Sequence, residues 1–186
     1  MQKKINLNQI ICDHIDTIKS IESYELKINK IVSNIKKCFK KKGRLILCGN
    51  GGSASDASHF AAELVGRFKK DRKGFDVICL SSDSSIITAI GNDYGYEKVF
   101  SKQLESIVKN KNDLFFVIST SGNSKNIIDG LKYCKLKGIQ TIGLIGGDGG
   151  KAKKYLDENI IISSKSTARI QEAHITLIHV ICEFFE

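Results

Sequence analysis

The chain has 186 residues, 41% of them hydrophobic and 26% charged, which is typical of a globular protein and excludes a disordered chain or a small disulfide-stapled domain. No apolar run reaches the length of a membrane span, so no membrane is expected among its partners. The net charge of +9 comes from lysines spread along the chain without interleaved aromatics, which favours a solvated basic surface over a nucleic-acid platform; no nucleic acid is expected.

The N-terminal segment predicts helices that are extra to the main fold. Residues 5–41 carry isoleucines and leucines at helical spacing, with a candidate break near Ser23 and a stop at Gly43 after a run of lysines. We expect residues 1–42 to pack on the domain and on partner subunits. Because residues 1–4 lack the apolar core of a signal peptide, we also expect cytoplasmic residence.

After Gly43, short apolar runs alternate with helical patterns, as in a parallel sheet covered on both faces. We therefore predict an α/β fold, a doubly wound five-stranded parallel sheet flanked by helices, within a single domain over residues 1–186. The expected strands are 44–48, 76–80, 113–119, 140–145 and 159–162. The expected helices are 53–66, 84–91, 95–109, 124–136, 149–156 and 168–185.

The six cysteines predict no disulfide framework and no thiolate metal site. None forms a C-x-x-C pair, and most lie in apolar helix or strand patterns. We expect reduced, buried thiols at positions 12, 38, 48, 79, 134 and 182.

A glycine-rich segment, Gly49-Asn50-Gly51-Gly52-Ser53, follows the first predicted strand and opens a helix. Unpaired N–H groups and the helix dipole make such a helix start a candidate anion site. The segment loosely matches a dinucleotide fingerprint, but that fingerprint wants an acidic residue about 20 residues on, at the end of the next strand. The next strand ends in serines instead, so a dinucleotide site is not favoured, and an anion site or a simple tight turn stays open.

The helix that follows places Ser55, His59 and Glu63 on one face, because they recur every four residues. A His-x-x-x-Glu pair can bind a metal or place a carboxylate base beside an imidazole. The spacing is common, so by itself a surface pair is favoured.

Two further polar segments follow predicted elements. The segment Gly91-Asn92-Asp93-Tyr94-Gly95-Tyr96 is a turn by itself and, in context, a candidate hydroxyl-binding loop. The segment Ser119-Thr120-Ser121-Gly122-Asn123-Ser124 follows the strongest strand and precedes a helix, so hydroxyls and N–H groups could hold a phosphate dianion. Helix capping is the alternative, but it needs one hydroxyl rather than four.

The terminal helix carries Gln171, His174 and His179. The two histidines lie about 140° apart around the helix and cannot share one ligand. Gln171 and His179 lie about 80° apart and about 12 Å apart along the axis, so they reach one point only if both side chains extend toward each other. For His174 we favour a core or interface histidine.

These motifs together resemble the sugar isomerase (SIS) family, and within it the phosphoheptose isomerases. The resemblance covers nearly the whole chain. It is carried by G-N-G-G-S at 49–53, H-F-x-x-E at 59–63, G-N-D at 91–93, S-T-S-G-N-S at 119–124, D-G-G at 148–150, and R-I-Q-E-x-H at 169–174 with the later His179. One position departs from several relatives, which carry Asp where this chain has Ala168.

The resemblance implies a homotetramer with active sites between subunits, and conversion of sedoheptulose 7-phosphate to D-glycero-D-manno-heptose 7-phosphate. That reaction is the first step toward the nucleotide-activated heptoses of lipopolysaccharide or capsule. It moves a carbonyl through an enediol, which suits a carboxylate base and an imidazole.

The resemblance also assigns roles to individual residues. It implies Glu63 and His179 as the acid/base pair, and a zinc ion on His59, Glu63, Gln171 and His179. The phosphorylated seven-carbon sugar would be held by Asn50, Gly51, Gly52, Ser53, Ser55, Glu63, Asn92, Asp93, Ser119, Thr120, Ser121, Ser124 and Gln171. Two alternatives stay open: a non-catalytic SIS protein that binds a sugar phosphate or the replication initiator, and an isomerase of another sugar phosphate, such as a pentose 5-phosphate.

Overall fold

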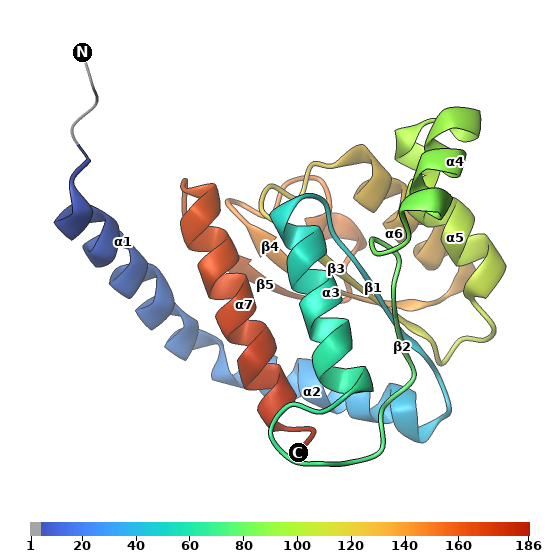
Figure 1. The fold of residues 1–186 in the computed structure, drawn as a ribbon, viewed down its shortest axis with the longest axis horizontal. Coiled ribbons are helices and arrows are strands. Elements are labelled where there is room, and N and C mark those ends of the chain that lie inside the picture. Colours follow the sequence, from blue (N-terminus) through green and yellow to red (C-terminus); the bar gives the residue numbers. More distant parts are fainter. Residues whose placement is uncertain (1–4) are drawn as a thin grey trace.

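The computed structural model describes residues 5–186 and contains a five-stranded, all-parallel sheet (Figure 1). The strand order is β2-β1-β3-β4-β5, so the chain leaves β1 toward one edge of the sheet and enters β3 on the other side. The predicted fold class is confirmed. The strands are β1 Leu45–Cys48, β2 Val77–Cys79, β3 Leu114–Ser119, β4 Gln140–Gly146 and β5 Glu158–Ile162.

Helices cover both faces of this sheet, because alternate strand residues point to opposite sides. One face carries α2 (Glu25–Lys40), α3 (Gly52–Val65) and α7 (Thr167–Glu183), with α1 (Leu7–Lys19) running along the outer side of α7 (Figure 1). The other face carries α4 (Ser84–Tyr94), α5 (Val99–Ile107) and α6 (Lys125–Lys137). Short 3-10 helices span Ser20–Tyr24, Tyr96–Lys98 and Lys153–Tyr155.

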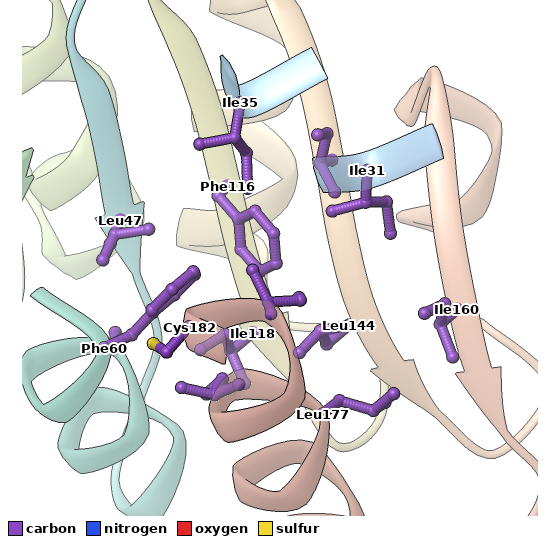
Figure 2. Packing of buried hydrophobic residues seen from close by; sticks show 14 of the residues in the cluster. Ile31, Ile35, Leu47, Phe60, Phe116, Ile118, Leu144, Ile160, Leu177 and Cys182 are labelled. Atoms are coloured by element: carbon purple, nitrogen blue, oxygen red, sulfur yellow. The ribbon is translucent and has the colours of Figure 1, made fainter. Parts of the chain in front are cut away.

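The core under α3 and α7 is built from large apolar side chains (Figure 2). The rings of Phe60 and Phe116 pack edge to face, with centroids 5.5 Å apart. His174 lies in this core, fully buried, and neither ring nitrogen has a hydrogen-bond partner. Burial lowers the pKa of His174 to about 4, so the ring is neutral at pH 7. The predicted core position of this histidine is confirmed, but the hydrogen-bonded ring expected of a satisfied core histidine is not observed.

The structure corrects two predicted helix boundaries and one predicted helix. The helix expected over 149–156 is wrong: only Lys153–Tyr155 forms a 3-10 turn, because Gly149 and Gly150 have φ of +92° and +51°. The segment expected to turn at Gly91 is helical as far as Tyr94. The next helix starts at Val99 rather than 95, after Gly95 with φ of +90°.

The N-terminal helices differ in how they pack. The predicted break is present as the 3-10 helix Ser20–Tyr24, where the Ser20 and Ser23 hydroxyls donate to the carbonyls three residues back. After it, α2 buries five side chains against the sheet, whereas α1 buries none. A groove of about 440 Å³ lies between α7 and the N-terminal segment from the end of α1 to the start of α2. Its lining includes Ile18, Ile21 and Phe184.

Other expectations for the chain are met only in part. All six cysteines are unpaired, as expected, but Cys12 is exposed rather than buried because it lies on α1. No helix of residues 5–186 is long and apolar enough to cross a membrane. Residues 1–4, on which the cytoplasmic expectation rests, lie outside the described part. The single-domain organisation over 1–186 stays a prediction.

Candidate active site

Two polar loops meet at the carboxyl ends of β1 and β3, where the strand connections diverge. These strands are neighbours in register, with Cys48 beside Val117, so the segments that follow them flank one crevice. In doubly wound sheets this switch point is where ligands bind. Sequence motifs that lie 70 residues apart are thereby brought to one place.

The glycine loop after β1 is shaped by close backbone contacts. A Cβ at Gly49 would lie 2.2 Å from the Ser53 carbonyl oxygen, and Gly51 has a φ of +57°. Ser81, two residues after β2, accepts a hydrogen bond from the Gly49 N–H (3.1 Å) and donates one to the Gly49 carbonyl (2.8 Å). The sequence motifs did not point to Ser81; a hydroxyl at the end of the adjacent strand was its only sign.

The serine loop after β3 divides its hydroxyls between two tasks. Ser119 and Ser121 accept hydrogen bonds from backbone N–H groups of their own loop, at 3.1 and 3.2 Å. Ser124 stands at the N-cap of α6, yet its side chain makes no capping hydrogen bond. Capping therefore does not explain Ser124, and its hydroxyl is available to a ligand at the helix N-terminus.

The Asp148-Gly149-Gly150 turn packs against the serine loop. Gly122 has a φ of +63°, and a Cβ there would lie 2.2 Å from the Gly149 carbonyl oxygen. The Asp148 carboxylate accepts from the Gly150 N–H at 2.9 Å, which holds the turn closed. The three residues thus position the loop rather than form a helix.

An amide network links the glycine loop to the start of α6 across the crevice. Asn50 in the glycine loop and Asn126 in α6 donate to each other's side-chain oxygens, at 2.9 and 2.8 Å. The Tyr96 hydroxyl donates to the same Asn50 oxygen at 3.1 Å. A cavity of about 430 Å³ opens beside this network, lined by Asn50, Tyr96, Glu97, Ser124, Lys125 and Asn126. The sequence predicted Asn50 and Ser124 as site residues and included Tyr96 in the candidate loop 91–96, whereas Glu97, Lys125 and Asn126 were missed.

A second polar cluster lies between α3 and α7. His59 and Glu63 sit one turn apart, and the His59 Nε2 is 3.1 Å from the Glu63 Oε1. The His179 Nε2 from α7 is also 3.1 Å from the His59 Nε2. Phe68 stacks on the His179 ring, and Arg72 closes the end of α3 by donating to the Glu63 carbonyl at 2.8 Å. The structure thus brings together three of the four predicted metal ligands.

Gln171 does not join this cluster within the chain. Its side chain lies against the glycine loop, where a Cβ on Gly52 would meet the Gln171 Nε2 at 2.3 Å. His179 lies two turns further along α7, about 12 Å away along the axis. As the side chains lie, no group of three or more His, Cys, Asp or Glu residues within 5–186 could hold a metal ion.

The remaining predicted residues occupy mixed positions. Asn92 and Asp93 are exposed on α4, where the Asn92 amide donates to the Asp93 carboxylate at 2.9 Å, and no hydrogen bond of the described residues joins them to either loop. Ser53 is buried in the first turn of α3, whereas Ser55, like Gly51 and Gly52, is exposed.

Asp56, which the motifs did not single out, is half-buried one turn before His59. One of its carboxylate oxygens is buried without a hydrogen-bond partner. Burial raises its pKa to about 6, with His59 opposing the shift.

Comparison with known proteins places the chain in a family. Residues 13–146 match the SIS domain model, and the chain belongs to the SIS domain family. Among curated relatives, the phosphoheptose isomerase of Helicobacter pylori is 49% identical over 168 residues, which are 90% of this chain and 87% of the relative. Phosphoheptose isomerase 1 of Campylobacter jejuni is 45% identical over 94% of this chain and 93% of its own.

Solved structures agree with this assignment. The phosphoheptose isomerase of Neisseria gonorrhoeae superposes with a TM-score of 0.89 at 37% identity, covering 95% of both chains. That of Francisella tularensis gives 0.88 at 29% identity, covering 96% of this chain and 95% of that one. Because both matches include at least 95% of this chain, they extend over the N-terminal helices as well as the sheet.

Proposed function

We propose that the chain is a phosphoheptose isomerase that converts sedoheptulose 7-phosphate to D-glycero-D-manno-heptose 7-phosphate in the cytoplasm, for lipopolysaccharide or capsule biosynthesis. The observation that carries the proposal is the cluster of one carboxylate and two imidazoles at 3.1 Å separations, in a chain so similar to phosphoheptose isomerases. A non-catalytic binding protein is not favoured, because it has no need of this cluster.

The crevice is suited to binding the phosphate of the substrate, and the cluster is suited to proton transfer. Ser124 and the N-terminus of α6 offer hydrogen-bond donors to a phosphate. Glu63 would take the proton from C1 of the ketose to give an enediol, and His179 would exchange protons between the two oxygens, so that a proton can return to C2. Each role fits the residue type: a carboxylate for carbon acid abstraction, an imidazole for transfer near neutral pH.

Zinc is part of the proposal. His59, Glu63 and His179 supply the nitrogen and oxygen donors that zinc prefers, and their donor atoms already lie at separations close to those of neighbouring ligands on one ion. Small side-chain rotations and a fourth donor are needed to complete a site, and Gln171 is the remaining candidate. When bound, zinc would stabilise negative charge on the substrate oxygens.

We also propose a homotetramer with shared active sites, and the positions of Gln171 and α1 support this proposal. Gln171 is about two turns from His179 in its own chain, so a second copy is the simpler source of the fourth donor. The apolar face of α1 also lacks cover: Ile10, Ile11 and Ile15 are 40%, 46% and 43% exposed. Packing of α1 against another subunit would bury these side chains.

Turnover of sedoheptulose 7-phosphate tests the function directly. We expect purified protein supplied with zinc to convert it to a heptose 7-phosphate, identified by NMR. A protein that leaves this substrate unchanged while remaining folded, by circular dichroism, would overturn the proposal. Ribulose 5-phosphate and other shorter ketose phosphates, assayed in parallel, would show whether another isomerase activity is present instead.

A further inference from the structure

The amide pair Asn50–Asn126 spans the crevice at the switch point between β1 and β3. Asn126 is only 2% exposed, although it lies in the first turn of α6 beside the serine loop. Its partner Asn50 belongs to the glycine loop, 76 positions earlier. The pair is therefore a direct bridge between the glycine loop and the start of α6, which follows the serine loop at the proposed substrate site.

Hydrogen-bond counting fixes the orientation of both amides. The Ile127 N–H donates to the Asn126 Oδ1 at 2.9 Å, so the oxygen of Asn126 must face that group. The Asn50 Nδ2 then faces the Asn126 Oδ1, and the Asn50 Oδ1 faces the Asn126 Nδ2. Because this atom of Asn50 is the amide oxygen, which can only accept, the Tyr96 hydroxyl must donate to it as well.

This arrangement leaves Asn50 with one unused polar group. An amide oxygen accepts two hydrogen bonds, and here Asn126 and Tyr96 supply both. An amide nitrogen donates two, and only one is used by Asn126. Asn50 can therefore donate to a ligand but cannot accept from one without breaking the network.

We propose that Asn126, together with Tyr96, is a positioning residue that holds Asn50 as a hydrogen-bond donor toward an oxygen acceptor of the bound sugar phosphate. The inference rests on the proposed function, because it takes the crevice as the substrate site. It limits the kind of substrate group that can contact Asn50: that group must accept a hydrogen bond, as a carbonyl or phosphate oxygen does, and cannot be a hydroxyl that donates. It also assigns Asn126 and Tyr96 an effect on substrate binding that passes through Asn50.

A double-mutant cycle on binding tests the bridge. We expect Asn50→Ala and Asn126→Ala each to weaken sedoheptulose 7-phosphate binding about tenfold, measured by calorimetry in a Glu63→Gln background that prevents turnover. Because Asn126 acts through Asn50, the double variant should bind no more weakly than Asn50→Ala alone. Losses that multiply to about a hundredfold would overturn the inference and show two independent roles.

Tyr96→Phe gives a second test that does not disturb the core. Tyr96 is 58% exposed, so removing its hydroxyl should leave the melting temperature unchanged and raise KM about threefold, with kcat nearly constant. Tyr94→Phe is the matched control: it is also 58% exposed, and its hydroxyl makes no hydrogen bond within residues 5–186. Equal KM values for the two variants would overturn the role of Tyr96.

The failure of this inference and of the proposed function are distinguishable. If the wild-type protein binds sedoheptulose 7-phosphate but does not turn it over, the isomerase function is contradicted. The double-mutant cycle on binding can still be measured in that case. Wild-type protein that turns it over, with additive losses in the cycle, contradicts the inference alone.

Discussion

The crevice between β1 and β3 and the cluster between α3 and α7 are built differently. In the crevice, the polar groups Asn50, Asn126 and Ser119 are bonded to one another or to backbone, and two of them are nearly inaccessible. In the cluster, the side chains of His59 and Glu63 are 45% and 22% exposed, and their contacts are to titratable groups. One chain thus holds an ordered polar network at the proposed binding region and a more exposed set of titratable groups at the proposed reaction centre.

The difference has a structural cause. The crevice loops leave neighbouring strands whose register is fixed by the buried sheet, so they keep their places without help from outside the chain. The cluster lies at the partly exposed contact between α3 and α7, and Gln171, its fourth predicted member, lies about two turns away near Gly52. We infer that binding is organised within a chain and that the chemistry is completed by assembly.

The largest expected effect separates the two regions outright. Glu63→Gln keeps the shape of the side chain but removes the base, so kcat should fall by at least about 10³-fold. Binding of inorganic phosphate or of substrate should survive, because the crevice is untouched. Glu105→Gln, an exposed change on α5 where the carboxylate pairs with Lys102 at 2.9 Å, is the control and should keep full activity. Equal loss of binding and turnover would contradict the division.

Complementation tests whether the cluster is completed by another subunit. Gln171→Ala and His179→Ala should each be nearly inactive, and co-expressed they should regain about a quarter of wild-type activity, since random pairing rebuilds about one site in four. Steady-state rates of the co-purified oligomer, normalised to protein, measure this.

A second pair of variants controls the complementation. His59→Ala co-expressed with His179→Ala should stay inactive, because these two imidazoles meet within one chain at 3.1 Å. Recovery in this pair, or none in the first, would contradict the shared site.

The fold could be read from the sequence because its signals are local. Each strand is a short apolar run, and Gly43 and the flanking polar segments mark where helices give way to strands. The failure at 149–156 has a cause that is not local: the expected helix required helical backbone at Gly149 and Gly150, whose positive φ values serve the contact with Gly122. A tertiary contact therefore overrode a weak helical pattern.

The site was predictable only where motifs carried it. Helix spacing correctly placed His59 and Glu63 on one face, but only the resemblance to a family brought in His179 from the far end of the chain. Asn126 was missed because its role depends on β1 lying beside β3, which no local pattern shows. The axial distance from Gln171 to His179 followed from helix geometry alone, and it is the basis of the complementation test.

A smaller effect is expected at the serine loop. Ser121→Ala combined with Ser124→Ala should raise KM about tenfold to a hundredfold with little change in kcat, because hydroxyl bonds to a charged phosphate are lost. Stability should fall little, since Ser124 does not cap α6 and Ser121 accepts only one exposed loop hydrogen bond, from the Asn123 N–H at 3.2 Å. Asp83→Ala is the contrasting control: it removes an N-cap bond of 3.0 Å, so it should cost about 1 kcal/mol of stability and leave KM unchanged. An unchanged KM in the serine variant would place the phosphate elsewhere.

The smallest effect on activity is expected from His174, which shares α7 with His179 but faces the core. Its pKa of about 4, against 6.5 for an unperturbed histidine, means that the unfolded chain binds more protons between these pH values. Its contribution to stability is therefore present above pH 6.5 and lost as pH falls through 4, by about 3 kcal/mol. His174→Leu should flatten the pH dependence of the unfolding free energy in urea by that amount, with kcat and KM at pH 7.5 nearly unchanged. If the variant and the wild type showed the same pH dependence of the unfolding free energy, His174 would accept a proton in the folded state. A large loss of turnover in the variant would mean that His174 takes part in the reaction as well as in the core.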